Sequence, residues 1–200
     1  MMQAKALFIL LTLFLLLTFS AAAEQRYDIP IEGSPSWGPE DAPVTIVEFI
    51  DYQWPHCNAV GPAVKKILED YEGKVRFVIK NYPYKYRDFA FISAEATRAA
   101  WDQEKFWEMH WLLHEKYPRL DKQSLISYAE ELGLDMKKFR KDLDGMRHLK
   151  EINEDVKLAK DLDLYSTPAF FINGIKAVGN RPYWSFQKII DEELNRLSGE

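Results

Sequence analysis

The apolar run Val44–Ile50 constrains the fold more than any other part of the chain. It is apolar on both faces apart from Glu48, which is typical of a central strand in a sheet covered on both sides. The apolar spacing from Val60 to Tyr71 then predicts an amphipathic helix, and residues 74–80 alternate like a second strand. A strand, a helix and a strand in this order favour a parallel pair. Within the helix, Gly61-Pro62 is expected to bend it rather than end it, because the apolar spacing continues beyond.

The remaining chain adds a helical block, a hairpin and a last helix. Residues 87–162 have helical spacing throughout, whereas two short apolar runs flank Asn173-Gly174, a pair that favours a two-residue hairpin turn. Spacing from Phe186 to Leu197 predicts a C-terminal helix. The predicted fold class is therefore α/β, a central sheet flanked by helices with an inserted all-helical subdomain. The predicted units are an extended lead-in at 24–43 with an edge strand near 27–31, a sheet domain made of 44–86 and 163–200, and an insert at 87–162.

The N-terminus has the three parts of a secretory signal. Lys5 precedes the apolar run from Ala6 to Phe19, and small residues up to Ala23 follow. We expect a signal peptide at residues 1–23 with cleavage after Ala23, and a periplasmic or secreted protein. The alternative is an uncleaved membrane anchor, which would be the protein's only link to a membrane.

Composition limits the other function classes. A formal net charge of −5 and a pI near 5.5 give no reason to expect nucleic acid as a partner. The single cysteine, Cys57, excludes an internal disulfide and needs another explanation in an exported protein. His110 and His114 have helical metal-ligand spacing, but no third ligand is visible, so we expect packing roles, no metal and no cofactor.

Four features together resemble the DsbA-like branch of the thioredoxin superfamily, extracytoplasmic thiol–disulfide oxidoreductases with an inserted helical domain. They are the turn Trp54-Pro55-His56-Cys57 between strand and helix, Glu48 six residues before position 54, the Thr167-Pro168 step, and the sequence 170–174 after it. The resemblance covers residues 40–197. It implies that 44–86 and 163–200 form a thioredoxin-like domain, and that Pro55-His56 belongs with the more oxidising members.

The resemblance also implies a role for each residue of the motif. Position 54 would be the attacking thiolate, favoured by the helix N-terminus and by His56, and Cys57 would be the resolving thiol. Glu48 would exchange a proton with Cys57. Pro168 would be cis, so that the Thr167 backbone pairs with an extended substrate. The implied partners are substrate proteins with cysteines and a partner that regenerates the redox state. Two simpler interpretations stay open, a small buried apolar role for Cys57 and a surface position for Glu48.

The first redox position departs from the family pattern, because it is Trp54 rather than cysteine. Three hypotheses explain it. In the first, Trp54 is a translation of UGA, the codon that also encodes selenocysteine, and the native motif is selenocysteine-Pro-His-Cys. Alternatively, the protein is a catalytically silent relative that binds extended or unfolded chains as a chaperone or adaptor. In the third, the residue was replaced to block turnover.

Overall fold

Residues 25–199, the part of the chain that the structure describes, form a sheet of five strands in a computed structural model. The strands are ordered β1-β3-β2-β4-β5. β2 and β3 run parallel, whereas the other neighbouring pairs are antiparallel. The bounds are Ser36–Trp37 for β1, Val44–Ile50 for β2, Val75–Asn81 for β3, Ala169–Ile172 for β4 and Ile175–Val178 for β5. The α/β class and the central parallel pair are confirmed, while the predicted signal peptide at 1–23 lies outside the described residues.

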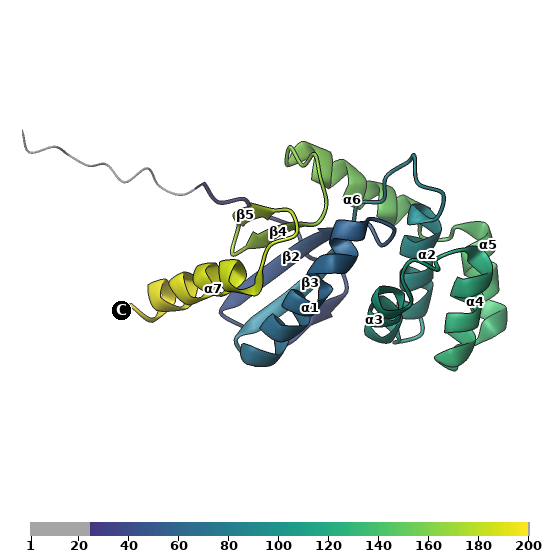
Figure 1. The fold of residues 1–200 in the computed structure, drawn as a ribbon, viewed down its shortest axis with the longest axis horizontal. Coiled ribbons are helices and arrows are strands. Elements are labelled where there is room, and N and C mark those ends of the chain that lie inside the picture. Colours follow the sequence, from purple (N-terminus) through teal and green to yellow (C-terminus); the bar gives the residue numbers. More distant parts are fainter. Residues whose placement is uncertain (1–24, 200) are drawn as a thin grey trace, which may run out of the picture.

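The helices divide into two that pack on the sheet together and a block inserted between β3 and β4. Their bounds are Pro55–Asp70 for α1, Ala90–Trp101 for α2, Phe106–Lys116 for α3, Lys122–Glu131 for α4, Met136–Gly145 for α5, Leu149–Asp161 for α6 and Tyr183–Ser198 for α7. Figure 1 shows α1 and α7 in front of the sheet and α2 to α5 gathered beside it, with α6 leading back toward the strands. This arrangement confirms the predicted helical insert.

The two faces of the sheet follow from the two-residue period of its strands. Ile46 and Ile50 of β2 belong to the cluster that includes the buried side chains of α1 and α7. Val47 and Phe49 belong to a second cluster, which includes Ala159 of α6. Glu48 shares the period of Ile46 and Ile50 and therefore points to the α1 face, where it is 2% exposed.

A buried ion cluster lies on the opposite face. Lys80 of β3 places its Nζ 3.2 Å from Asp155 Oδ1, and Arg98 of α2 places Nη2 2.9 Å from Asp155 Oδ2. The backbone N–H of Asn81 also donates to Asp155 Oδ2, at 2.9 Å. The sequence pattern did not predict this cluster, in which one carboxylate of α6 joins β3 to the insert.

α1 continues through Pro62, as expected, and the Gly61-Pro62 pair receives a side chain from the insert. A proline inside a helix has no N–H, so the carbonyl of Asn58, four residues earlier, lacks its helical partner. Burial lowers the pKa of His114 on α3 to about 4, and an interaction with the Asn58 backbone opposes that shift. Its Nδ1 is buried without a hydrogen-bond partner among residues 25–199. A Cβ on Gly61 would lie 3.0 Å from His114 Nδ1, and glycine therefore leaves room for the imidazole.

The lead-in differs from its prediction, whereas the hairpin agrees with it. No strand forms at 27–31 within the described chain. Instead, Arg26 makes an isolated bridge to Ile175, and β1 pairs with β3 ten residues further along. Pro30 cannot donate a ladder hydrogen bond, which disfavours pairing at 27–31. At the hairpin, Asn173 and Gly174 have the positive φ angles of 44° and 84° that its two-residue turn requires.

Candidate active site

The turn before α1 presents position 54 at the helix N-terminus. Trp54 is the N-cap residue, and its carbonyl accepts the N–H groups of Cys57 at 3.0 Å and Asn58 at 3.2 Å. Pro55 occupies the first helical position, where a missing N–H costs nothing and its fixed φ suits the helix. Pro55 and His56 are exposed, whereas Cys57 is fully buried. The side chain at 54 is partly exposed, whereas Cys57 is shielded within the first turn.

Cys57 lies close to Glu48 and Thr167, two of the groups that the resemblance implied. Burial raises the pKa of its thiol well above the ordinary value, and the negative charge of Glu48 raises it further. A hydrogen bond with the Thr167 side chain partly offsets the effect of burial. The structure therefore brings Glu48, Cys57 and Thr167 together, although they come from β2, α1 and the segment before β4.

Glu48 has no counter-charge on its face of the sheet among residues 25–199. Burial raises its pKa from an ordinary value near 4.5 to about 8, and its Oε1 has no hydrogen-bond partner among the described residues. A carboxyl group in this state keeps its proton near neutral pH, since removing water penalises the charged form. The side chain is inside the sheet layer rather than at a surface edge, and it can hold or release a proton in the physiological range.

The Thr167-Pro168 peptide bond is cis, as expected. The Thr167 backbone N–H donates to the Tyr84 hydroxyl at 2.7 Å, and Thr167 Oγ1 lies 3.3 Å from the same oxygen. Tyr84 comes from the loop after β3, and its ring meets that of Trp54 edge-on at 5.9 Å. Tyr84 therefore links the Thr167-Pro168 step to the turn at position 54.

The indole of Trp54 is surrounded by aromatic and cationic groups. The His56 ring lies 5.4 Å away, and the Arg87 guanidinium carbon is 4.2 Å from the indole centroid. The indole Nε1 and the Arg87 Nε are both buried and have no hydrogen-bond acceptor among the described residues. Indole has no exchangeable sulfur or selenium, so as the sequence stands this position packs and stacks.

Asp51 and Gln53 hold the loop after β3 against the turn. Asp51 accepts the Gln53 N–H at 2.8 Å and the Tyr84 N–H at 2.9 Å. The Gln53 amide oxygen accepts the Phe89 N–H at 2.7 Å, and the Gln53 carbonyl accepts Arg87 Nη1 at 3.2 Å. Burial raises the pKa of Asp51, and these backbone donors together with the Arg87 charge oppose that rise. The loop is therefore fixed over position 54 from both ends.

The sequence analysis placed Glu48, position 54, Cys57, Thr167 and Pro168 at one site, and the structure brings them together. It missed four residues that complete the surroundings: Asp51, Gln53, Tyr84 and Arg87. One signal could have found them. The loop follows β3 at the same sheet edge at which β2 delivers the turn, because parallel strands end together and sites gather at that edge.

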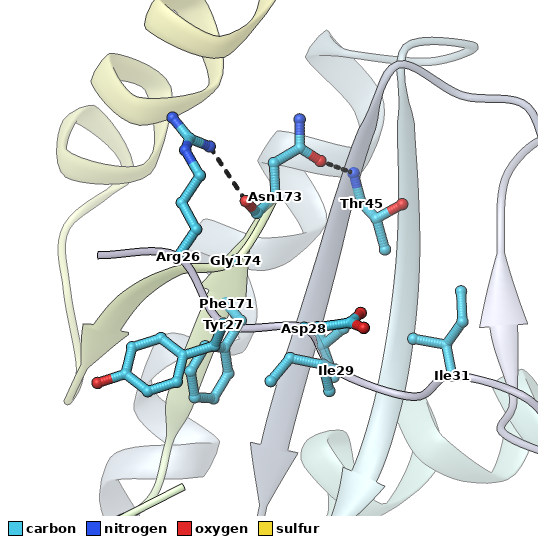
Figure 2. A pocket seen from close by; sticks show the side chains of 10 residues that line it. Arg26, Tyr27, Asp28, Ile29, Ile31, Thr45, Phe171, Asn173 and Gly174 are labelled. Carbon is cyan, nitrogen blue, oxygen red and sulfur yellow. Dashed lines mark hydrogen bonds between the residues drawn. The ribbon is translucent and has the colours of Figure 1, made fainter. Parts of the chain in front are cut away.

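A pocket of about 500 Å³ lies on the other face of the sheet, away from position 54. Figure 2 shows its lining, in which Ile29 and Phe171 are apolar. Arg26 Nη1 donates to the Asn173 carbonyl at 3.1 Å, and the Asn173 side chain accepts the Thr45 N–H at 2.8 Å (Figure 2). These polar groups fasten the N-terminal segment to the sheet and the hairpin.

Two further features are absent from residues 25–199. No group of three or more His, Cys, Asp or Glu side chains has the arrangement of a metal site. No helix in this part is long and apolar enough to span a bilayer.

The strand order, the cis-proline step facing a helix N-terminus and the inserted helices define a thioredoxin-fold protein of the DsbA-like type. The sequence matches the thioredoxin family over residues 31–192, and the chain belongs to that family. One solved structure similar to it is oxidised BdbD from Bacillus subtilis, with 25% identity, a TM-score of 0.79 and coverage of 86% of this chain and 98% of BdbD. Another is a thioredoxin-like oxidoreductase from Silicibacter pomeroyi, with 26% identity, a TM-score of 0.73 and coverage of 80% and 91%.

Curated relatives contain this domain within much longer chains. The chain is 41% identical over 147 residues to the Na(+)/H(+) antiporter NhaA 3 of Salinispora tropica, a match that covers 73% of this chain and 22% of the antiporter. It therefore spans about a fifth of the length of the curated relatives that it matches.

Proposed function

We propose that the protein is an exported thiol–disulfide oxidoreductase that acts on protein cysteines, and that position 54 natively carries selenocysteine or cysteine. One observation carries the proposal. A buried Cys57 lies one helical turn after a partly exposed N-cap position, above a protonatable Glu48 and beside a cis Thr167-Pro168 step. A binding protein needs neither the acid nor the resolving thiol, whereas dithiol exchange uses both.

Two successive thiolate attacks complete the exchange. In the oxidised protein the selenium or sulfur at 54 is bonded to Cys57 Sγ. A substrate thiolate attacks the atom at 54, that bond breaks, and Cys57 leaves as a thiolate that takes up a proton. A second substrate thiolate attacks the substrate sulfur that is bonded to the atom at 54, and the residue at 54 leaves as an anion. The substrate loses two electrons and gains a disulfide, while the turn gains two electrons; the reverse sequence reduces a substrate.

The helix N-terminus and Glu48 would serve different halves of this exchange. Backbone N–H groups at the start of α1 favour an anion at 54 and so make it a good leaving group. Glu48, protonated near neutral pH, would supply the proton that the departing Cys57 needs. The Thr167 backbone would pair with an extended substrate, which must then displace the Tyr84 hydroxyl from the Thr167 N–H. Whether the protein oxidises or reduces its substrates depends on the partner that regenerates it: an oxidising partner drives substrate oxidation, and a reducing partner drives substrate reduction.

The decisive experiment has a genetic and a chemical part. Codon 54 is read in the gene, where UGA supports selenocysteine and UGG excludes it. Trp54→Cys is then expected to oxidise a reduced dithiol peptide or to reduce insulin, whereas Trp54→Ser, and Trp54→Cys combined with Cys57→Ser, should not complete the reaction. A folded Trp54→Cys protein with neither activity would contradict the proposal. Export is tested separately by the mass of the mature protein, expected to lack residues 1–23.

A second candidate is a catalytically silent protein that binds extended or unfolded polypeptides. The observation that favours it is the packing of Trp54 against Tyr84 and Arg87, with Tyr86 73% exposed beside them. In this case Trp54→Ala should weaken the binding of an unfolded peptide, while Cys57→Ser should not. If a UGG codon is found and Trp54→Cys is active, the third explanation, a residue replaced to block turnover, is favoured instead.

A further inference from the structure

Two buried hydrogen-bond donors at the turn lack an acceptor in the described part of the chain. The Trp54 indole N–H and the Arg87 Nε–H are both buried, and neither has an acceptor among residues 25–199. The groups are in contact, with the guanidinium carbon 4.2 Å from the indole centroid, but a donor cannot satisfy a donor. Buried donors without acceptors are uncommon in folded proteins and mark places where a partner is missing. The missing partner here is an acceptor, and an anion would suit a guanidinium best.

Arg87 does not depend on the indole for its position. Its Nη1 donates to the Gln53 carbonyl at 3.2 Å, and the neighbouring loop is held by the bonds of Phe89 to Gln53 and of Tyr84 to Asp51. A smaller side chain at 54 would therefore leave the guanidinium at the turn. It would stay bonded to the Gln53 carbonyl, one residue away from position 54, with its Nε–H still unused.

We propose that Arg87 is the counter-charge that stabilises an anionic nucleophile at position 54, a selenolate or a thiolate. This inference rests on the proposed function, because Trp54 itself has no negative charge. It assigns the cation of the site to the loop after β3, in addition to the helix N-terminus and His56. A stabilised anion is a weaker base and a better leaving group, so Arg87 would favour release of the substrate from position 54.

Other groups also act on the charge at 54. His56 on α1 and Tyr84 on the loop lie with their rings 5.4 Å and 5.9 Å from the indole. Asp51, directly after β2, brings a carboxylate to the same turn; burial raises the pKa of this carboxyl, and the charge of Arg87 opposes that rise. Beneath the turn, Cys57 and Glu48 are buried and favour their neutral forms. Removing Arg87 would therefore leave Asp51 acting on position 54 without its nearest counter-charge.

The test measures the pKa of a single introduced thiol. Trp54→Cys with Cys57→Ser provides one thiolate, followed by its ultraviolet absorbance against pH. Adding Arg87→Gln should raise the thiol pKa by about one unit, the lower end of the usual range because Arg87 is partly exposed. Arg87→Lys, which keeps the charge, should restore most of the shift. Lys85→Gln is the matched control, because it removes one exposed positive charge from the same loop. An Arg87→Gln shift no larger than that of Lys85→Gln would overturn the proposal.

A second measurement needs no change at Arg87. In the Trp54→Cys, Cys57→Ser protein, the nitrogen NMR signal of Arg87 Nε should move with pH at the midpoint of the thiol titration. A signal that stays constant through that midpoint would also overturn the proposal.

Exchange activity is assayed separately, with Trp54→Cys and Cys57 intact. An Arg87-dependent pKa in a protein without activity would refute the proposed function, and only the electrostatic effect of Arg87 on position 54 would stand. Activity with an Arg87-independent pKa would do the opposite.

Discussion

The two faces of the sheet bury ionisable side chains in opposite ways. Lys80 and Glu48 lie on the neighbouring strands β3 and β2, both less than one-tenth exposed. Lys80 points to the α6 face and is paired with Asp155, which also binds Arg98. Glu48 points to the α1 face, where the described part of the chain provides no counter-charge, and burial raises its pKa to about 8. The first arrangement joins the insert to the sheet, whereas the second costs stability. Costly buried groups of this kind concentrate at functional sites.

The largest expected effect is on the paired face. Asp155→Ala would leave Lys80 and Arg98 buried with no carboxylate between them, which should lower the free energy of unfolding by about 3–5 kcal/mol. Urea denaturation at neutral pH measures the change. Asp161→Ala is the control on the same helix, because its pair with Lys157 is exposed and should matter by less than about 1 kcal/mol. Equal effects of the two substitutions would remove the contrast between the faces.

The second effect has the opposite sign. Glu48→Gln should raise the free energy of unfolding at pH 8 by about 2–4 kcal/mol, since it removes a carboxyl group that is costly to ionise in the folded protein. The folded-state pKa of about 8 is above the ordinary value near 4.5, so the folded protein holds the proton more tightly. Stability from this group is therefore greatest at low pH and is lost as the pH rises between these two values.

Denaturation of the unmodified protein and of Glu48→Gln across that pH range measures the difference. The curves should meet toward the acid end and separate toward pH 8. Parallel curves would show that Glu48 has a charged partner after all. In the Trp54→Cys background the same substitution should slow thiol exchange, because glutamine cannot supply a proton to Cys57.

The smallest effect concerns the link between the turn and the cis-proline step. Tyr84→Phe removes the acceptor of the buried Thr167 N–H and should lower the free energy of unfolding by about 1 kcal/mol, limited by the access of water to the half-buried ring. Tyr86→Phe is the control, because Tyr86 is largely exposed and stacks on Tyr84 through its ring rather than its hydroxyl. Thermal unfolding distinguishes them, and equal melting temperatures for both variants would mean that water replaces the bond at no cost.

The sequence predicted the elements whose patterns are local. The period of β2 is visible in Ile46 and Ile50, so the inward direction of Glu48 follows from its neighbours. The positive φ angles at Asn173-Gly174 are likewise a property of those two residues. For the same reason the central part of the fold and the members of the turn could be predicted without a structure.

The parts that escaped prediction depend on partners far apart in the chain. Lys80 looked like an ordinary position of an alternating strand, because Asp155 lies 75 residues further along. Tyr84 and Arg87 lie in the loop between β3 and α2. The helical spacing predicted that the insert begins at 87, whereas α2 begins at Ala90, and only the folded chain brings the two side chains to Thr167 and position 54. Similarly, β1 is two residues long and owes its existence to β3 rather than to a propensity of its own.

The contact of the His114 ring with Gly61-Pro62 of α1 limits which substitutions related sequences can carry at these positions. A side chain at 61 would place a Cβ 3.0 Å from His114 Nδ1, so the ring would have to shift. An ordinary residue at 62 would donate its N–H to the Asn58 carbonyl, as in a regular helix. Loss of the imidazole would remove its interaction with the Asn58 backbone. Each single replacement spoils the fit of the other two residues. We therefore expect positions 61, 62 and 114 to be inherited as a set, so that related chains either keep all three or have replaced all three.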